Sequence, residues 1–166
     1  MDLPEVPAQV DRLDRRISAA MRRLGVPALR LSLAVIFIWF GLLKPLGLSP
    51  AAPLVKATVG WMPFFSPDGW LAIIGWWEVL IGLTFLTRKT ARIAIGLLAM
   101  QMVGTFLPLV ILPGATFQAG HYPYAPTMEG QYIIKNLLII SAAMVLGGTV
   151  RHPAPPGEER PRGVAR

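Results

Sequence analysis

The sequence predicts an all-α integral membrane protein: a four-transmembrane-helix bundle with an N-terminal amphipathic surface helix and a short extracytoplasmic interfacial helix. Three observations support this fold class. Hydrophobic residues make up 54% of the 166 residues, and the charges gather in clusters between apolar stretches. Four of these stretches approach the ~20 residues that a transmembrane helix needs. Finally, Lys and Arg fall mostly on one side of the predicted spans, as the positive-inside rule requires.

The first element expected is a basic amphipathic helix over residues 10–24. Its apolar residues recur at spacings of three and four: Val10, Leu13, Ile17, Met21 and Leu24. Its arginines occupy the other faces: Arg12, Arg15, Arg16, Arg22 and Arg23. Gly25 and Pro27 are expected to end this helix. Residues 1–27 are therefore interpreted as a cytoplasmic arm on an anionic leaflet, with a solvated basic arm as the alternative.

The transmembrane domain is expected over residues 28–150. Its spans are predicted at about 28–44, 70–87, 91–112 and 131–150. The first is slightly short for a full crossing unless Arg30 and Lys44 extend toward the two surfaces from its ends. Ser66 and Pro67 provide a cap and a first-turn signal before the second span.

Small residues in the last two spans are also expected to let helices approach closely. They are Gly96, Ala99, Gly104, Gly147 and Gly148. Between the first two spans, residues 44–69 are predicted to hold the short interfacial helix. Between the last two, residues 113–130 combine turn residues with aromatic rings suited to headgroup depth. Together these two loops are expected to form a small extracytoplasmic cap.

The distribution of basic residues predicts the orientation. Thirteen lie on one side of the spans: Arg12, Arg15, Arg16, Arg22, Arg23, Arg30, Arg88, Lys89, Arg92, Arg151, Arg160, Arg162 and Arg166. The other side holds Lys44, Lys56 and Lys135. Both termini and the turn at 88–92 are therefore expected in the cytoplasm, and residues 151–166, rich in Pro, Gly and charge, are interpreted as a flexible tail. Basic residues interleaved with apolar spans argue against nucleic acid as the partner of this +7 chain.

The chain contains no cysteine. Disulfides, iron–sulfur clusters and covalently attached haem are thereby excluded, so any redox chemistry would need a separately bound cofactor. The two histidines, His121 and His152, lie in a loop and at the cytoplasmic edge rather than in mid-span. We therefore predict no metal site.

The ionisable residues inside the spans are the candidate site. Glu78, in the stretch GWWEVLIGL, lies eight residues into the second span, which places it ~12 Å below the outer surface at ~1.5 Å per residue. Lys135 lies ~6 Å deep by the same rise, and Lys44 ends the first span on that side. A charge facing lipid costs about 2.5–3.5 kcal/mol on insertion scales. These side chains are therefore expected inside the bundle, with Glu78 paired to Lys135 or Lys44 and held ionised by the opposite charge.

Four neighbours complete this predicted site. Asn136 and Gln101 are the expected hydrogen-bonding partners of the ion pair. Trp76 and Trp77 flank Glu78 closely enough to stack on a flat ring. Two interpretations remain open: the charges fix helix order and register, or they form a mixed-sign pocket for a polar headgroup such as a quinone, an anion or a lipid.

Three segments resemble a known family. FIWFGLLKPLG at the end of the first span, GWWEVLIGL in the second and MEGQYIIKNLLII at the start of the fourth are similar to the DoxX-like (DoxX/YkgB-type) small bacterial integral membrane proteins. The resemblance covers about residues 28–150, and Lys44, Glu78 and Lys135 are its most informative positions. It implies a four-helix bundle in the bacterial inner membrane. It also implies an association with redox systems, because one related branch is a subunit of thiosulfate:quinone oxidoreductase.

The expected function is a non-catalytic or accessory inner-membrane subunit that packs against a larger redox or energy-transducing complex. A lipid or quinone near Glu78 and Lys135 is the expected ligand. The expected partners are the lipid bilayer and either other membrane subunits or a second copy of the chain. Two alternatives stay open: a quinone-linked oxidoreductase membrane subunit with proton transfer at Glu78, and a small dimeric transporter using Glu78.

Overall fold

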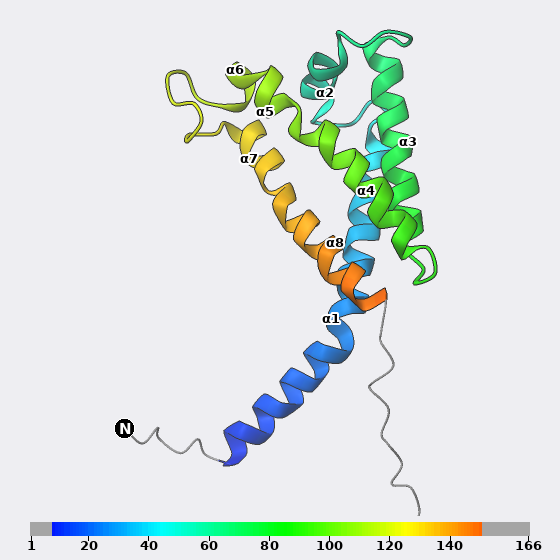
Figure 1. Cartoon of the computed structure of the whole chain (residues 1–166), viewed down its shortest axis with the longest axis vertical. Coiled ribbons are helices and arrows are strands. Elements are labelled where there is room, and N and C mark those ends of the chain that lie inside the picture. Colours follow the sequence, from blue (N-terminus) through cyan, green and yellow to red (C-terminus); the bar gives the residue numbers. More distant parts are fainter. Residues whose placement is uncertain (1–7, 151–166) are drawn as a thin grey trace, which may run out of the picture.

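The computed structural model describes residues 8–150, which form helices joined by turns and loops, without a β-strand in this range (Figure 1). Four helical segments within it are long and apolar enough to cross a membrane: Gln9–Leu43, Pro67–Phe85, Ala91–Ile111 and Met128–Thr149. The four predicted apolar segments are therefore present as helices, and their crossing of a membrane stays a prediction. The predicted tail at 151–166 and the first seven residues of the predicted arm lie outside the described residues.

Helix α1 (Ala8–Leu43) is one continuous helix that contains both the predicted arm and the first span. The expected end at Gly25 and Pro27 is therefore wrong. Proline removes one backbone hydrogen bond and bends a helix, but the turns on either side can continue when their other bonds and packing hold them. Figure 1 shows α1 changing direction between its N-terminal part and the part inside the bundle, and Pro27 is the residue within it that accounts for such a bend.

Helix α3 (Pro67–Phe85) begins at the predicted signal. The Ser66 hydroxyl accepts a hydrogen bond from the Gly69 backbone N–H at 3.1 Å, which satisfies one of the free donors of the first turn. Pro67 occupies the first helical position, where its missing N–H costs nothing. The helix therefore starts three residues before the predicted boundary at residue 70.

The third and fourth spans are each divided. Helix α4 (Ala91–Phe106) is followed by the short α5 (Pro108–Ile111) and α6 (Pro113–Thr116), each beginning at a proline. Helix α7 (Met128–Ile134) leads into α8 (Asn136–Val150) across Lys135. The Lys135 N–H still donates to the Gln131 carbonyl at 3.0 Å, so α7 and α8 run on as one path.

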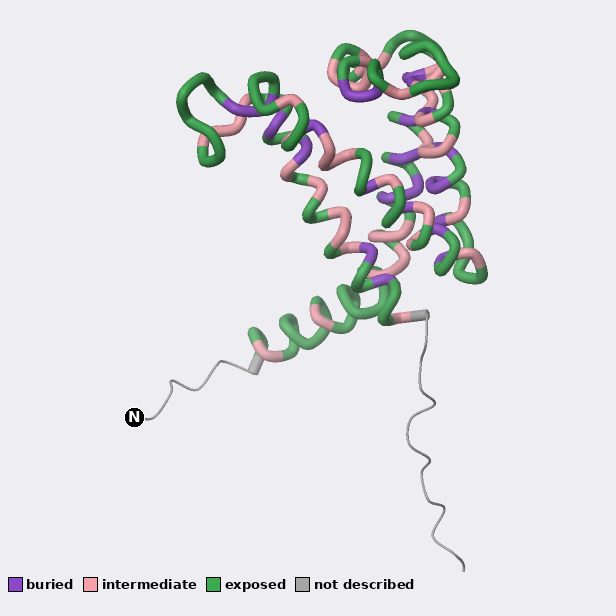
Figure 2. Tube along the Cα trace, turned by 45° about the horizontal axis from the view of Figure 1, so that its top comes forward, coloured by how far each residue is buried: buried purple, intermediate pink, exposed green. Residues whose placement is uncertain are grey.

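The four long segments close into a ring. Helix α3 packs on α1 and α4, and α8 packs on α4 and α1. Their shared core is built from buried apolar residues of all four segments: Leu33, Ala34, Phe37, Ile81, Phe85, Ala94, Leu98, Met102, Ala143 and Leu146. Figure 2 shows buried positions along the facing sides of these helices, whereas the N-terminal part of α1 is largely exposed.

Among the long helices, α1 and α3 approach each other closely at glycines. A methyl group on Gly82 would lie 2.6 Å from Ile38 Cγ1 and 2.8 Å from the Ala34 carbonyl oxygen. Gly41 and Gly75 face each other equally closely. The glycines expected to serve this purpose do not: added methyls at Gly96, Gly104 and Gly148 would meet nothing within 4 Å, and at Gly147 only a side chain at ordinary contact distance. The close contact lies between the first two spans rather than the last two.

The loops at the opposite end from the α3–α4 turn form a small structured region. It contains helix α2 (Ala52–Val59), which packs on α3 and agrees with the predicted short helix. Its interfacial position stays a prediction. The Thr127 hydroxyl caps α7 and also donates to the Ala115 carbonyl at 2.8 Å, which ties α7 to α6. A methyl on Gly130 would fall 2.0 Å from the Thr116 carbonyl oxygen, so these two segments touch backbone to backbone.

Candidate functional site

The glycine contact between α1 and α3 positions the two charged residues of the candidate site. A methyl group on Gly41 would lie 2.8 Å from the Gly75 carbonyl oxygen and 3.0 Å from Glu78 Cβ. A methyl on Gly75 would in turn lie 2.8 Å from Lys44 Cβ. Lys44 directly follows the last residue of α1, where a positive charge complements the free carbonyls of the helix end. Backbone proximity therefore brings the Lys44 and Glu78 side chains together.

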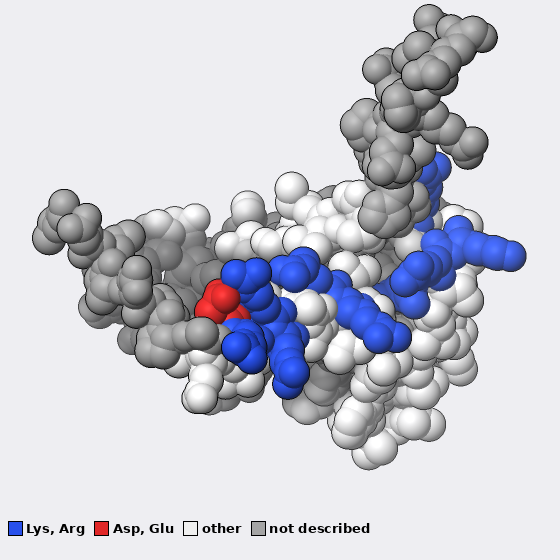
Figure 3. Space-filling model, turned by 90° about the horizontal axis from the view of Figure 1, so that it is seen from below, with Lys and Arg blue, Asp and Glu red and all other residues white. Residues whose placement is uncertain are grey.

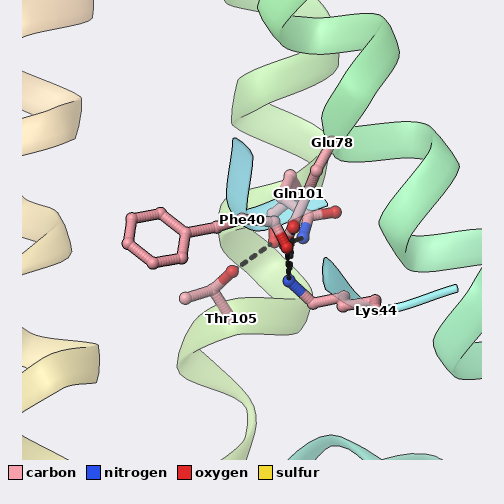
Figure 4. A network of polar contacts seen from close by, with 5 residues as sticks. All are labelled: Phe40, Lys44, Glu78, Gln101 and Thr105. Carbon is pink, nitrogen blue, oxygen red and sulfur yellow. Dashed lines mark hydrogen bonds and ion pairs between the residues drawn. The ribbon is translucent and has the colours of Figure 1, made fainter. Parts of the chain in front are cut away.

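Lys44, Glu78 and Gln101 form one polar network from α1, α3 and α4 (Figure 4). Lys44 Nζ donates to Glu78 Oε2 in an ion pair and also reaches the Phe40 carbonyl oxygen at 3.5 Å. Gln101 Nε2 donates to Glu78 Oε1 at 3.0 Å. The Thr105 hydroxyl donates to the Gln101 backbone carbonyl at 3.0 Å. Each carboxylate oxygen thus has a donor, and the Phe40 ring points away from the network.

The ion pair is sheltered. The Lys44 side chain is 8% exposed and the Glu78 side chain 13% exposed. Burying two charges is unfavourable unless their geometry and remaining hydrogen bonds compensate for lost hydration. Here the amide of Gln101 and the end of α1 supply those additional bonds. The network is therefore electrically balanced as it stands.

Lys135 and Asn136, predicted to join this network, lie elsewhere. Lys135 is exposed, with Nζ 5.4 Å from the centroid of the Tyr132 ring. Asn136 Nδ2 donates within its own helix, to the carbonyls of Tyr132 and Ile133. Ile133 is the inward residue of this turn, at 5% exposure, and two residues along an α-helix is more than half a turn. Lys135 therefore points away from the side that packs on the bundle.

A shallow apolar groove of about 170 Å³ lies beside the network, between α3 and α4. It is lined by Ile73, Ile74, Trp77, Met100 and Gln101. Gln101 is shared: it lines the groove while its amide donates to Glu78. Within the described side chains, its side-chain oxygen accepts no hydrogen bond. The groove thus combines four apolar walls with one amide that is connected to a buried charge pair.

The two tryptophans of the predicted site separate. Trp77 lines the groove, and its indole N–H donates to the Leu97 carbonyl at 3.4 Å. Trp76 is 58% exposed on another face of α3, since adjacent helical residues point about 100° apart. Three further lining residues of the groove, Ile73, Ile74 and Met100, were not predicted as site residues. Ile73 and Ile74 lie four and three residues before Trp77, so their helical spacing was an available signal, whereas Met100 directly precedes Gln101 and had no such signal.

Residues 8–150 contain no cluster of three or more His, Asp or Glu side chains that could hold a metal ion. No family model, curated protein or solved structure matches the chain. The function is therefore inferred from the polar network and the groove.

Proposed function

We propose that this chain is a non-catalytic, multi-pass subunit of a larger redox or energy-transducing membrane complex, and that it holds the headgroup of a quinone or lipid in the α3–α4 groove. The observation that carries the proposal is the double role of Gln101, which lines the groove and hydrogen-bonds Glu78. The resemblance to DoxX-like proteins agrees with it. The proposed location is the bacterial inner membrane with both termini cytoplasmic, because the side with thirteen Lys and Arg is expected inside.

The dimensions and chemistry of the groove favour this class of ligand. Pockets that enclose a whole drug-sized molecule measure about 300–1,000 Å³, so about 170 Å³ suits a single ring or a headgroup fragment. Ile73, Ile74 and Met100 provide apolar contact, and Trp77 provides a flat surface for stacking. The side-chain oxygen of Gln101 can accept a hydrogen bond, and its amide can donate a second one. An isoprenoid or acyl tail would remain on the apolar exterior of the bundle.

A binding role suits the network better than proton transport. Both oxygens of Glu78 already accept hydrogen bonds, and its charge is balanced by Lys44. In a cation exporter, the membrane carboxylate must exchange one bound cation for another. Here the positive charge of Lys44 is paired with Glu78 and repels a second cation at this position. The network therefore serves to fix Gln101 at the wall of the groove.

The test is binding of a short-chain ubiquinone analogue to the full chain in mild detergent, measured by calorimetry. Met100→Trp should fill the groove and abolish binding. Gln101→Leu removes a hydrogen bond worth about 0.5–1.5 kcal/mol, so affinity should fall about two- to tenfold. Met144→Trp is the matched control, because Met144 is 72% exposed on α8 and does not line the groove.

A lipid occupant is distinguished by repeating the measurement after delipidation and by identifying the lipid that copurifies with the wild type but not with Met100→Trp. Unchanged affinity in Met100→Trp, with no difference in bound lipid, would remove the proposed site. Copurification of a cofactor-bearing membrane partner in mild detergent would support the accessory role. Catalytic turnover by the isolated chain would contradict it.

A second candidate is the membrane subunit of a quinone-linked oxidoreductase in which Glu78 transfers a proton. One hydrogen bond through Gln101 separates Glu78 from the groove, which is the observation in its favour. In the assembled complex, Glu78→Gln would then abolish quinone reduction while quinone still binds. Retained reduction in that variant would leave the accessory role as the better account.

A further inference from the structure

The N-terminal part of α1, residues 8–25, has two chemically opposite faces. On a helix of 100° per residue, its apolar side chains fall on one stripe: Val10, Leu13, Ile17, Met21 and Leu24. Its five arginines fall on the opposite side: Arg12, Arg15, Arg16, Arg22 and Arg23. We call residues 8–25 the arm.

The apolar stripe of the arm has no cover within the described chain. Its five side chains are between 44% and 69% exposed. The hydrophobic core and the residues packed against it begin, within α1, only at Val26. Burial of apolar surface drives helix placement, so a stripe of five exposed apolar residues indicates an external surface against which it packs.

A second basic cluster lies at the same end of the molecule. It consists of Arg88, Lys89 and Arg92, in and just after the turn between α3 and α4, all exposed. Figure 1 shows this turn at the same end of the bundle as the arm, and Figure 3 shows Lys and Arg forming a band across this underside. The arm has two acidic residues, Asp11 and Asp14, against eight basic residues in the arm and the turn together, and Asp11 is paired with Arg15 at 2.9 Å. The surface as a whole is therefore strongly positive.

The bend of α1 lets both faces of the arm contact one membrane surface at the same time. A straight continuation of the span would carry the stripe away from the bundle into water. On the N-terminal side of Pro27, the arm instead bends away to one side of the bundle (Figure 1). An arm in this position can lay its stripe into the headgroup–acyl boundary while its arginines remain among the headgroups.

We propose that the arm and the α3–α4 turn form one binding surface for anionic phospholipid headgroups, with the apolar stripe toward the acyl chains. Guanidinium groups pair bidentately with phosphate, and polybasic segments beside a membrane span bind anionic leaflets. The proposal requires the bundle to span a bilayer, but it is independent of any ligand in the α3–α4 groove. A lipid surface fits better than a protein partner because one layer supplies both the negative charge and the apolar phase that the arm's two faces require.

The test uses the absence of cysteine to place single spin labels in the full chain. Met21→Cys puts the label on the apolar stripe, and Ala19→Cys puts it on the opposite face, both at exposed positions. Each variant is reconstituted in nanodiscs of phosphatidylcholine alone or with phosphatidylglycerol. Collisions with oxygen, which concentrates in lipid, and with a water-soluble nickel chelate are then measured. With phosphatidylglycerol, the label at 21 should favour oxygen and the label at 19 should favour nickel.

Charge variants separate lipid binding from simple burial. Replacing the five arm arginines by Gln should remove the contrast between the two labels, whereas replacing them by Lys should largely preserve it. Raising the salt concentration should weaken the contrast in the wild type, because exposed charges are screened. Neutralising Arg88, Lys89 and Arg92 together should reduce it by a smaller amount.

Three results would overturn the proposal. Both labels equally accessible to nickel in the anionic discs would show a solvated arm. A contrast independent of lipid charge would remove the headgroup interaction, and labels immobilised only when another protein is present would assign the arm to a protein partner. Failure of the chain to enter discs would contradict the membrane premise shared with the proposed function. Normal quinone binding with a solvated arm would overturn this proposal alone.

Discussion

At the scale of single residues, Lys44 and Glu78 depend on each other. Either charge alone would be costly in an apolar bundle, and together they leave no charge unbalanced. Gln101 and the Phe40 carbonyl complete their hydrogen bonds. Each of the two charges can therefore be buried only because the other is present. The pair is not a net source of stability, since proteins in which apolar residues of similar volume replace a buried ion pair are often equally or more stable.

Removing one partner of the ion pair should therefore destabilise the folded protein more than removing both. Glu78→Leu leaves Lys44 buried without a counter-charge, and Lys44→Met leaves Glu78 buried without one. Each single variant should lose about 3–5 kcal/mol of stability, whereas the double variant should lie close to the wild type. Unfolding of the purified protein in detergent, followed by circular dichroism, measures the difference.

The exposed ion pair of Lys56 and Asp68 provides the control. These side chains are 38% and 75% exposed, so solvent screens their interaction. Lys56→Met should change stability by no more than about 1 kcal/mol. Equal effects of Lys44→Met and Lys56→Met, or additive effects in the Lys44 and Glu78 double variant, would contradict the coupling.

At the scale of helices, the contact between α1 and α3 organises the site. Gly41, Gly75 and Gly82 let the two backbones touch, and the same contact places Lys44 over α3. Close approach at small residues is a common way to pack helices where apolar burial gives no preference between helix and lipid. The geometry of the site therefore follows from a backbone contact about one helical turn away from Lys44 and from Glu78.

Filling that contact should separate α1 from α3. In Gly82→Ala, the new methyl would lie 2.6 Å from Ile38 Cγ1 and 2.8 Å from a backbone oxygen, so the helices must shift. Overpacking of this kind costs about 1–3 kcal/mol. Gly96→Ala in α4 meets nothing within 4 Å and should be neutral or slightly stabilising, because alanine favours helix. Thermal unfolding of both variants in the same detergent makes the comparison. Equal unfolding midpoints of the two variants would contradict a specific close contact between α1 and α3.

Helix α1 also shows how local signals can be overridden. Gly25 and Pro27 are strong termination signals in isolation, yet the helix runs through both. The apolar span that follows has its own packing and hydrogen bonds, so one missing bond at Pro27 bends the helix without ending it. The bend then separates the arm from the apolar part of the same helix that packs in the bundle.

At the scale of the whole molecule, the two ends differ in charge. The α1 arm and the α3–α4 turn lie at one end, and the loops containing α2, α5 and α6 lie at the other (Figure 1). Exposed Arg and Lys cluster at the first end. We therefore expect the end with the arm to face the cytoplasm.

Cysteine accessibility in cells tests this orientation. Thr87→Cys places a thiol in the turn between α3 and α4, and Ala119→Cys places one in the opposite loops, both at exposed positions. A membrane-impermeant maleimide should label residue 119 in intact spheroplasts and residue 87 only after permeabilisation. The native chain, which lacks cysteine, is the blank. The reverse pattern would invert the proposed topology.

Four apolar helical segments, the cap and first-turn signal of α3 at Ser66 and Pro67, and an ion pair of Glu78 with either Lys44 or Lys135 could be predicted from the sequence. These follow from composition, capping chemistry and the cost of an isolated charge in an apolar segment, all of which are local. The choice between Lys44 and Lys135 required the three-dimensional structure, because it depends on which helix faces meet. The three-dimensional structure also shows that the close packing lies at Gly41, Gly75 and Gly82 and that a groove lies beside Gln101, neither of which was predicted. Apolar helix faces are nearly alike in sequence, so their pairing is fixed by three-dimensional fit rather than by any single segment.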